Sequence, residues 1–279
     1  MSKLKKNYFL IFLSIYFICG AYFSVQNGLS HDEFHEQRNW DYNISLIKNF
    51  LFNTEIESKF LNYPDKYYGV GFQIISQPIQ FLLKEIILTT QNVSEYGAHL
   101  LAKHFVVFIT FFGSGIFVYL ITKQIIKNNF FCSTVTCLYL LYPYLIGHGL
   151  FNPKDIPFLF FWISSTFVSL SILNKLLLNS NVNYKYITLI AFLTAILIST
   201  RISGVLIIIQ YTISVLIYLY FKKVHFFSFI IDEFKKISFF LILVFLFIYI
   251  FHPVFWKNPL LIFEAISFMN QHFNNVCTL

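Results

Sequence analysis

The residues best suited to chemistry lie in one twelve-residue stretch, which runs from Ser30 to Asp41 directly after the first long apolar run. The stretch holds four carboxylates, two histidines and an arginine, in a chain that is only 12% charged. Two of the carboxylates, Asp32 and Glu33, are adjacent. Neighbouring carboxylates beside an apolar surface can acquire different proton affinities, which leaves one of them as a general base. A solvated acidic helix start is the plainer alternative, and the stretch alone slightly favours it.

The two histidines of this stretch suggest a second kind of site. His31 and His35 are four residues apart, so on a helix their side chains lie on one face. With Asp32 or Glu36 they could hold a divalent cation. The order is not that of the zinc proteases, and histidines that hydrogen-bond within the loop are the interpretation we favour. No metal site is assigned, and a divalent cation stays an open alternative.

Arg201 is the one charged residue in the apolar stretch 186–221. A charged side chain at membrane depth costs on the order of 3 kcal/mol, so it usually faces a cavity and a partner. A guanidinium is well suited to phosphate, because it donates two parallel hydrogen bonds. The alternative is an arginine whose side chain extends to the outer interface.

Three further candidates flank other apolar runs. Lys154 could contact an anionic headgroup, and Asp155 could either join it or simply cap the helix that follows. His252 follows the last long apolar run and precedes Trp256, for which an interfacial anchor is the favoured interpretation.

Composition identifies the class of protein that must position these residues. The chain has 279 residues, is 57% hydrophobic and has a mean hydropathy of +0.66. A membrane span needs about 20 apolar residues, and several runs approach that length. The net charge of +7 does not indicate nucleic acid, because the lysines lie between apolar runs, as in cytoplasmic loops. The four cysteines lack metal-binding spacing.

We therefore expect an all-α fold: a polytopic transmembrane helical bundle, one domain over residues 1–279, with about seven spans. Residues 26–97 should form a long first extracytoplasmic loop that carries interfacial helices. One of these is expected at 68–83, where Gly69, Gly71 and Pro78 interrupt a short apolar run. The expected spans are 8–25, 98–122, 130–147, 156–173, 186–200, 202–221 and 237–251.

The distribution of lysines orients this bundle. A cytoplasmic N-terminus places eleven lysines in the inner segments, whereas the outer loop 26–97 has nine acids and five bases. If 68–83 spanned the membrane, the later loops would change sides and the bias would be lost. The acidic stretch, Lys154-Asp155, Arg201 and His252 then all lie on the outer side, so residues far apart in sequence are expected to converge.

In layout the chain resembles the multispanning glycosyltransferases that use lipid-phosphate sugars. These include the protein O-mannosyltransferases and the bacterial aminoarabinose transferases that modify lipid A. The most specific feature is Asp32-Glu33-Phe34-His35 after the first span, because O-mannosyltransferases carry Asp-Glu-x-His there. Looser similarities are Tyr63-Pro64 with the segment 67–83, the loop 152–155, Thr200-Arg201, and His252-Pro253 with Trp256.

The resemblance implies an enzyme that moves a sugar from a polyprenyl-phosphate donor to a lipid or protein acceptor. By it, Asp32 would be the base that deprotonates the acceptor and Glu33 would support the site. Arg201 and Lys154 would be candidates for the lipid phosphate, with His35, Asp155 and His252 as further substrate contacts. Members of this family are typically longer and have more spans, so a truncated chain and a minimal variant are both open.

Two alternatives from other classes remain. One is a transporter or flippase for a lipid-linked or anionic solute, with Arg201 holding the substrate. It is disfavoured because the sequence has no internal repeat and its charges gather at one surface. The other is a non-catalytic membrane assembly subunit. For the transferase we expect the bacterial inner membrane, with the active side in the periplasm, membrane lipids around it and no nucleic-acid partner.

Overall fold

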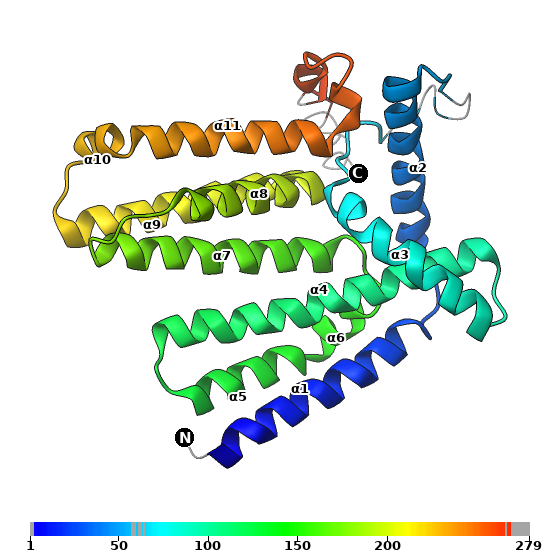
Figure 1. Cartoon of the computed structure of the whole chain (residues 1–279), viewed down its shortest axis with the longest axis horizontal. Helices are drawn as coiled ribbons and strands as arrows, with labels where there is room; N and C mark the ends of the chain where they lie inside the picture. Colours follow the sequence, from blue (N-terminus) through cyan, green and yellow to red (C-terminus); the bar gives the residue numbers. More distant parts are fainter. Residues whose placement is uncertain (1–2, 57–59, 61–62, 64, 266, 269–279) are drawn as a thin grey trace, which may run out of the picture.

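In the described part of this computed structural model, all the regular secondary structure is helical (Figure 1). It comprises residues 3–56, 60, 63, 65–265 and 267–268, with the backbone alone at residues 3–7, 31 and 32. The expectation of an all-α membrane protein is confirmed. Four helical segments are long and apolar enough to cross a membrane, or five if one bent pair is counted as a span. The expected count of seven is not confirmed by this measure, since two further apolar helical stretches of the described chain, 8–24 and 184–200, are shorter than the helices counted as candidate spans.

Most of the long helices run side by side along one direction (Figure 1). The clear candidate spans are α4 (Glu95–Ile125), α7 (Asp155–Leu177), η2 with α9 (Ile202–Leu206 and Ile207–Lys222) and α11 (Phe234–Phe251). The shorter apolar helices are α1 (Lys3–Ser24), of which 8–24 has described side chains, and α8 (Tyr184–Thr200). α8 packs between α7 and α11, and α4 packs against α1, α3, α5 and α7.

The expected span at 130–147 is instead broken into α5 (Asn129–Leu140) and α6 (Pro143–Gly149), which are bent by 63°. Pro143 explains the break, because proline cannot donate the backbone hydrogen bond of a continuous helix and occupies the first turn of the next one. The Asn128 side chain caps α5 by accepting hydrogen bonds from the amides of Phe130 and Phe131.

The helix is broken near Arg201, where the sequence predicts a reversal. α8 ends at Thr200, and the short 3-10 helix η2 carries the chain into α9. Gly204 is buried in this turn, and a Cβ there would lie 2.7 Å from the carbonyl oxygen of Leu197. Glycine therefore allows the turn to close against the end of α8.

Two helices of the segment 26–97 lie across one end of the bundle (Figure 1). α2 (His31–Phe52) contains most of the acidic stretch, and α3 (Gly71–Thr90) packs on α4 and α8. α3 contains Pro78 and is not among the helices that pass as candidate spans in the described chain. Two shorter elements complete the fold, namely α10 (Phe226–Asp232) before α11 and the 3-10 helix η3 (Pro253–Phe255) after it.

Candidate functional site

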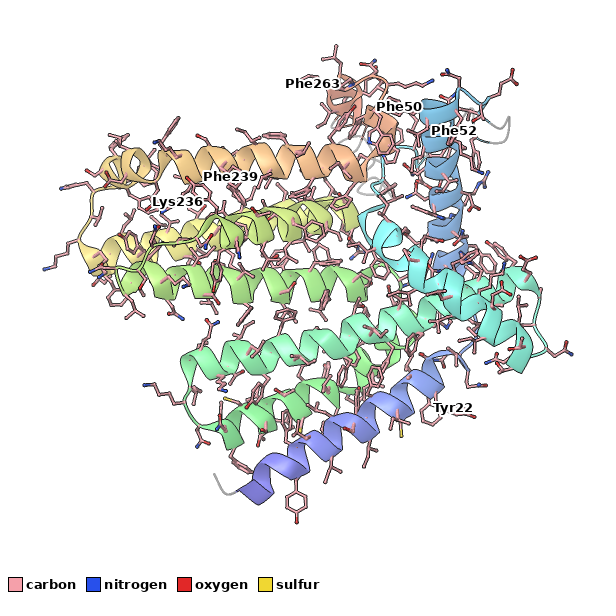
Figure 2. All side chains as sticks on the ribbon, viewed as in Figure 1. Tyr22, Phe50, Phe52, Lys236, Phe239 and Phe263 are labelled. Carbon is pink, nitrogen blue, oxygen red and sulfur yellow. The ribbon has the colours of Figure 1, made fainter. Side chains whose placement is uncertain are left out.

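The charged residues that could do chemistry gather at the end of the bundle where α2 and α3 lie. The start of α7 and the ends of α8 and α11 reach the same end, whereas the turns that carry Lys222 and Lys236 lie at the other (Figure 1). Figure 2 shows the separation directly, since Lys236 lies at one end and Phe50 of α2 at the other. This arrangement agrees with the expectation that the candidate site residues lie on one side and the lysines between the spans on the other.

Glu33 lies at the N-terminus of α2, and its carboxylate turns inward to α4. Its Oε1 accepts a hydrogen bond of 2.7 Å from the backbone amide of Ser30, which is part of a capping box. Its Oε2 lies 2.7 Å from Nε2 of His104, and both side chains are fully buried. Glu33 therefore joins the start of α2 to α4, and it is not part of an exposed acidic surface.

Asp32, the proposed base, is the second residue of α2. Its side chain, like that of His31, lies outside the described part of the structure. His35 lies on the exposed face of the same helix. Among the described side chains, no group of three or more His, Cys, Asp or Glu residues is placed to hold a metal ion.

A buried lysine makes the second link between α2 and α4. The Lys103 side chain is fully buried, and its Nζ lies 3.4 Å from Oε1 of Gln37. Gln37 in turn donates a hydrogen bond of 2.9 Å to Oδ1 of Asp41. Gln37 is one helical turn after Glu33, so two successive turns of α2 are held by neighbouring residues of α4.

Glu36 of α2 forms an ion pair with Lys154, which lies at the start of α7. Its Oε1 lies 3.1 Å from Nζ of Lys154, and its Oε2 accepts a hydrogen bond of 2.7 Å from Gln73 of α3. The ammonium of Lys154 also lies 4.9 Å from the centre of the Tyr68 ring, which is the geometry of a cation–π contact. Lys154 therefore contacts α2, the helix that carries the acidic stretch, as the sequence analysis expected.

Arg201 and Asp155 form the second charge pair between helices. Arg201 Nη1 lies 2.6 Å from Asp155 Oδ1, with the two side chains 44% and 45% exposed. Asp155 Oδ1 has no hydrogen-bond partner in the described structure, so its contact with Arg201 is an ion pair without a hydrogen bond. Asp155 Oδ2 accepts a hydrogen bond of 3.1 Å from Asn152.

Asn152, and not Asp155, provides the side-chain hydrogen bonds to the backbone at the start of α7. Asn152 Oδ1 accepts hydrogen bonds from the backbone amides of Lys154 and Asp155, at 3.0 and 2.9 Å. Asp155 is the first residue of α7, where its charge also interacts favourably with the helix dipole.

His252 does not contact these charges. Its Nδ1 donates to the carbonyl of Ile248 at 2.8 Å, and its ring stacks on Phe255 with centroids 5.4 Å apart. The ring also packs against the backbone of Gly69, where a Cβ would lie 2.6 Å from His252 Nε2. Burial lowers the pKa of His252 to about 4, so the side chain is neutral at pH 7. Trp256, which the sequence analysis interprets as an interfacial anchor, donates from Nε1 to the Tyr249 carbonyl at 2.8 Å.

A cavity of about 260 Å³ lies beside the C-terminal half of α2, and neither Glu33 nor Glu36 is part of its lining. Apolar and aromatic side chains of α2 and η3 form much of its lining, with Tyr42 and Val254 among them. Lys66 and Lys257 supply positive charge and Asn49 an amide. An apolar lining with a few polar groups is the usual character of a small-molecule site.

Lys103 and His104 are the site residues that sequence reasoning missed. Both lie inside the expected span 98–122, whose apolar composition concealed them. The signal was available, because an ionisable residue within a membrane-length run marks a candidate site by itself. That argument was applied to Arg201 alone.

Comparisons with protein-family models, with curated proteins and with solved structures find no match to this chain.

Proposed function

We propose that this chain is a membrane glycosyltransferase that moves a sugar from a polyprenyl-phosphate donor to a lipid or protein acceptor. The observation that carries the proposal is that α2, which bears Asp32, meets Lys154 at the end of an apolar bundle where Arg201 pairs with Asp155 of α7. Such a donor places its isoprenoid chain among apolar helices and its phosphate at their ends. The proposal puts the sugar and the phosphate at this end of the bundle, beside the start of α2 and the two cations.

The proposed chemistry is displacement at the anomeric carbon. Asp32 accepts the proton of the acceptor hydroxyl as its oxygen bonds to that carbon. The bond between the carbon and the phosphate oxygen breaks, and the polyprenyl phosphate leaves with the bonding electrons. Arg201 and Lys154 stabilise the charge that develops on the departing phosphate. Each cation now lies against a carboxylate, Asp155 or Glu36, which the phosphate would replace as the counter-ion.

The proposal includes a seven-crossing topology in the bacterial inner membrane. α1, the α5–α6 pair and α8 would cross together with the four clear spans, and the N-terminus would be cytoplasmic. Support comes from the lysines of the turns at 123–127, 175–185 and 222–236, which lie at the end opposite the candidate site. Single cysteines at Asp232 and Glu85 test it. In intact cells, a membrane-impermeant maleimide should label position 85 and spare position 232, and labelling of both from one side would refute the topology.

The decisive experiment is transfer or hydrolysis of a synthetic polyprenyl-phosphate sugar by purified protein in detergent. Wild type, Asp32→Asn and the control Asp232→Asn are compared for release of polyprenyl phosphate. Asp232 is exposed at the opposite end of the bundle, so its variant should match wild type. We expect Asp32→Asn to lose release by roughly 100-fold or more, the usual contribution of a general base. Equal release by Asp32→Asn and wild type would remove Asp32 as the base, whereas binding of labelled lipid without release would favour a transporter.

A further inference from the structure

His104 is a fully buried histidine whose two ring nitrogens both face hydrogen-bond acceptors. Nδ1 lies 3.0 Å from the backbone carbonyl oxygen of Ser24, at the end of α1. Nε2 lies 2.7 Å from Oε2 of Glu33, at the start of α2. A single histidine of α4 therefore contacts both ends of the connection between α1 and α2.

Counting protons defines the state of this pair. A carbonyl oxygen can only accept, so Nδ1 must carry a hydrogen. A neutral imidazole has one ring hydrogen, and with that hydrogen on Nδ1 the other nitrogen, Nε2, can only accept. An ionised carboxylate also only accepts, and the short distance from Nε2 to Oε2 then requires one additional proton between them.

We infer that Glu33 and His104 hold one shared proton and act as a neutral pair that fastens the first turn of α2 to α1 and α4. Their role is to position Asp32, the residue directly before Glu33. This role rests on the proposed function, whereas the shared proton does not. The pair is neutral in total whether the proton lies on Nε2 or on Oε2.

Burial supports a neutral pair at this place. A buried ionised group without compensation costs several kcal/mol, and here the other carboxylate oxygen has only the neutral Ser30 amide as its described hydrogen-bond partner. Lys103, the neighbour of His104 on α4, also interacts electrostatically with Glu33, but more strongly with Glu36, and its Nζ lies against Gln37. Glu36 and Asp41, the other described carboxylates of α2, contact Lys154 and Gln37 respectively. His104 is the titratable group within hydrogen-bond distance of the Glu33 carboxylate.

Two substitutions of Glu33 should differ in the hydrogen bonds that they keep. In Glu33→Gln, the amide oxygen can accept from Ser30 and the amide nitrogen can donate to Nε2 of a neutral His104. Every hydrogen bond of the wild type is then kept without the shared proton. Glu33→Ala removes both partners and leaves Nε2 of His104 buried without a donor.

Thermal unfolding in one detergent tests this distinction. We expect Glu33→Gln to unfold within about 2 °C of wild type and Glu33→Ala at least about 5 °C lower. Equal losses in both variants would show that the negative charge of Glu33 is required, and would overturn the inference.

Nitrogen NMR of ¹⁵N-histidine-labelled protein provides a readout that does not depend on stability. The His104 signals are those that change in Glu33→Gln. At pH 7, Nδ1 should be protonated in both proteins. Nε2 should be unprotonated in the variant, and its signal in wild type reports how the proton is divided between Nε2 and Oε2. An unprotonated Nδ1 in wild type would exclude the shared proton.

Measuring the release of polyprenyl phosphate separates this inference from the proposed function. If polyprenyl phosphate is released, Glu33→Gln should keep kcat within about tenfold of wild type, whereas Glu33→Ala should lose more. A loss in Glu33→Gln as large as that in Asp32→Asn, with unchanged stability, would refute a positioning role. If wild type releases nothing, the proposed function fails while the unfolding and NMR results still decide the shared proton.

Discussion

Arg201 Nη1 lies 2.6 Å from Asp155 Oδ1, so the end of α8 and the start of α7 are joined by two opposite charges. Both side chains are nearly half exposed, and an exposed ion pair contributes about 1 kcal/mol at most. The pair is therefore poorly explained as a device for stability. Its position favours a role in binding.

Arg201→Met should reduce sugar transfer by roughly 100-fold, because it removes a cation from the departing phosphate. The free energy of unfolding should change by no more than about 1 kcal/mol. Transfer and thermal unfolding are measured on the same preparation. Lys222→Met is the matched control, since Lys222 lies at the opposite end and donates to Asn179. Full transfer by Arg201→Met would exclude the guanidinium from phosphate binding.

Glu36→Gln should lower the free energy of unfolding by about 1–2 kcal/mol, because it weakens charge-assisted contacts that join α2 to α7. The matched control is Glu233→Gln. Glu233 pairs with Lys236 at 2.8 Å and with similar exposure, but within a single turn, and such pairs contribute only about 0.5 kcal/mol. Equal effects in thermal unfolding would show that Glu36 does not hold the two helices together.

Stability should depend on pH through His252. Its folded pKa of about 4 lies below the unfolded value of 6.5, so below about pH 6.5 the unfolded chain binds a proton that the folded chain excludes. Stability is therefore present above pH 6.5 and is lost as the pH falls towards 4, by at most about 3 kcal/mol.

His252→Gln keeps a side-chain donor but does not titrate, so wild type should lose stability relative to this variant between pH 6.5 and 4. The exposed His225 provides the control, and His225→Gln should follow the wild-type curve. Parallel curves for wild type and His252→Gln would show that His252 titrates normally.

Gly69→Ala should destabilise the protein by about 1–3 kcal/mol. The new Cβ would lie 2.6 Å from His252 Nε2 and 2.8 Å from the backbone oxygen of Ser199, and the backbone oxygen cannot move easily. Gly147→Ala is the control, because a Cβ there meets nothing within 4 Å and lies in a helix. It should be neutral or stabilising by up to about 1 kcal/mol. A neutral Gly69→Ala would mean that the end of α11 readily shifts.

Apolar run lengths and lysine positions were sufficient to predict most of the long helices and the end of the bundle at which Lys154, Asp155 and Arg201 lie. The reversal at Arg201 followed from arithmetic, since 36 residues of continuous helix would reach about 54 Å. The convergence of Lys154 and Arg201 with other charges was expected from the same orientation. These features depend on local amino-acid composition, which can be read directly from the sequence.

The particular partners could not be predicted in the same way. Glu33 faces His104, and Glu36 faces Lys154 and Gln73, because of how α2 crosses the ends of α3, α4 and α7. That crossing depends on packing between distant segments. His252 was expected to contact substrate, yet its described contacts are with Ile248, Phe255 and Gly69, and no pattern in the sequence distinguishes these two environments.

The length of α8 has a consequence for the depth of Arg201. The helix has 17 residues and so rises about 26 Å, several Å less than the roughly 30 Å hydrocarbon core of a bilayer. If the bilayer begins at the Asn183 cap, either it thins around this helix or acyl chains extend past Thr200. In the first case the guanidinium lies at the surface of the bilayer, and in the second case acyl chains reach its depth. A ligand carried on an isoprenoid could therefore approach it laterally within the leaflet, without first passing through bulk water.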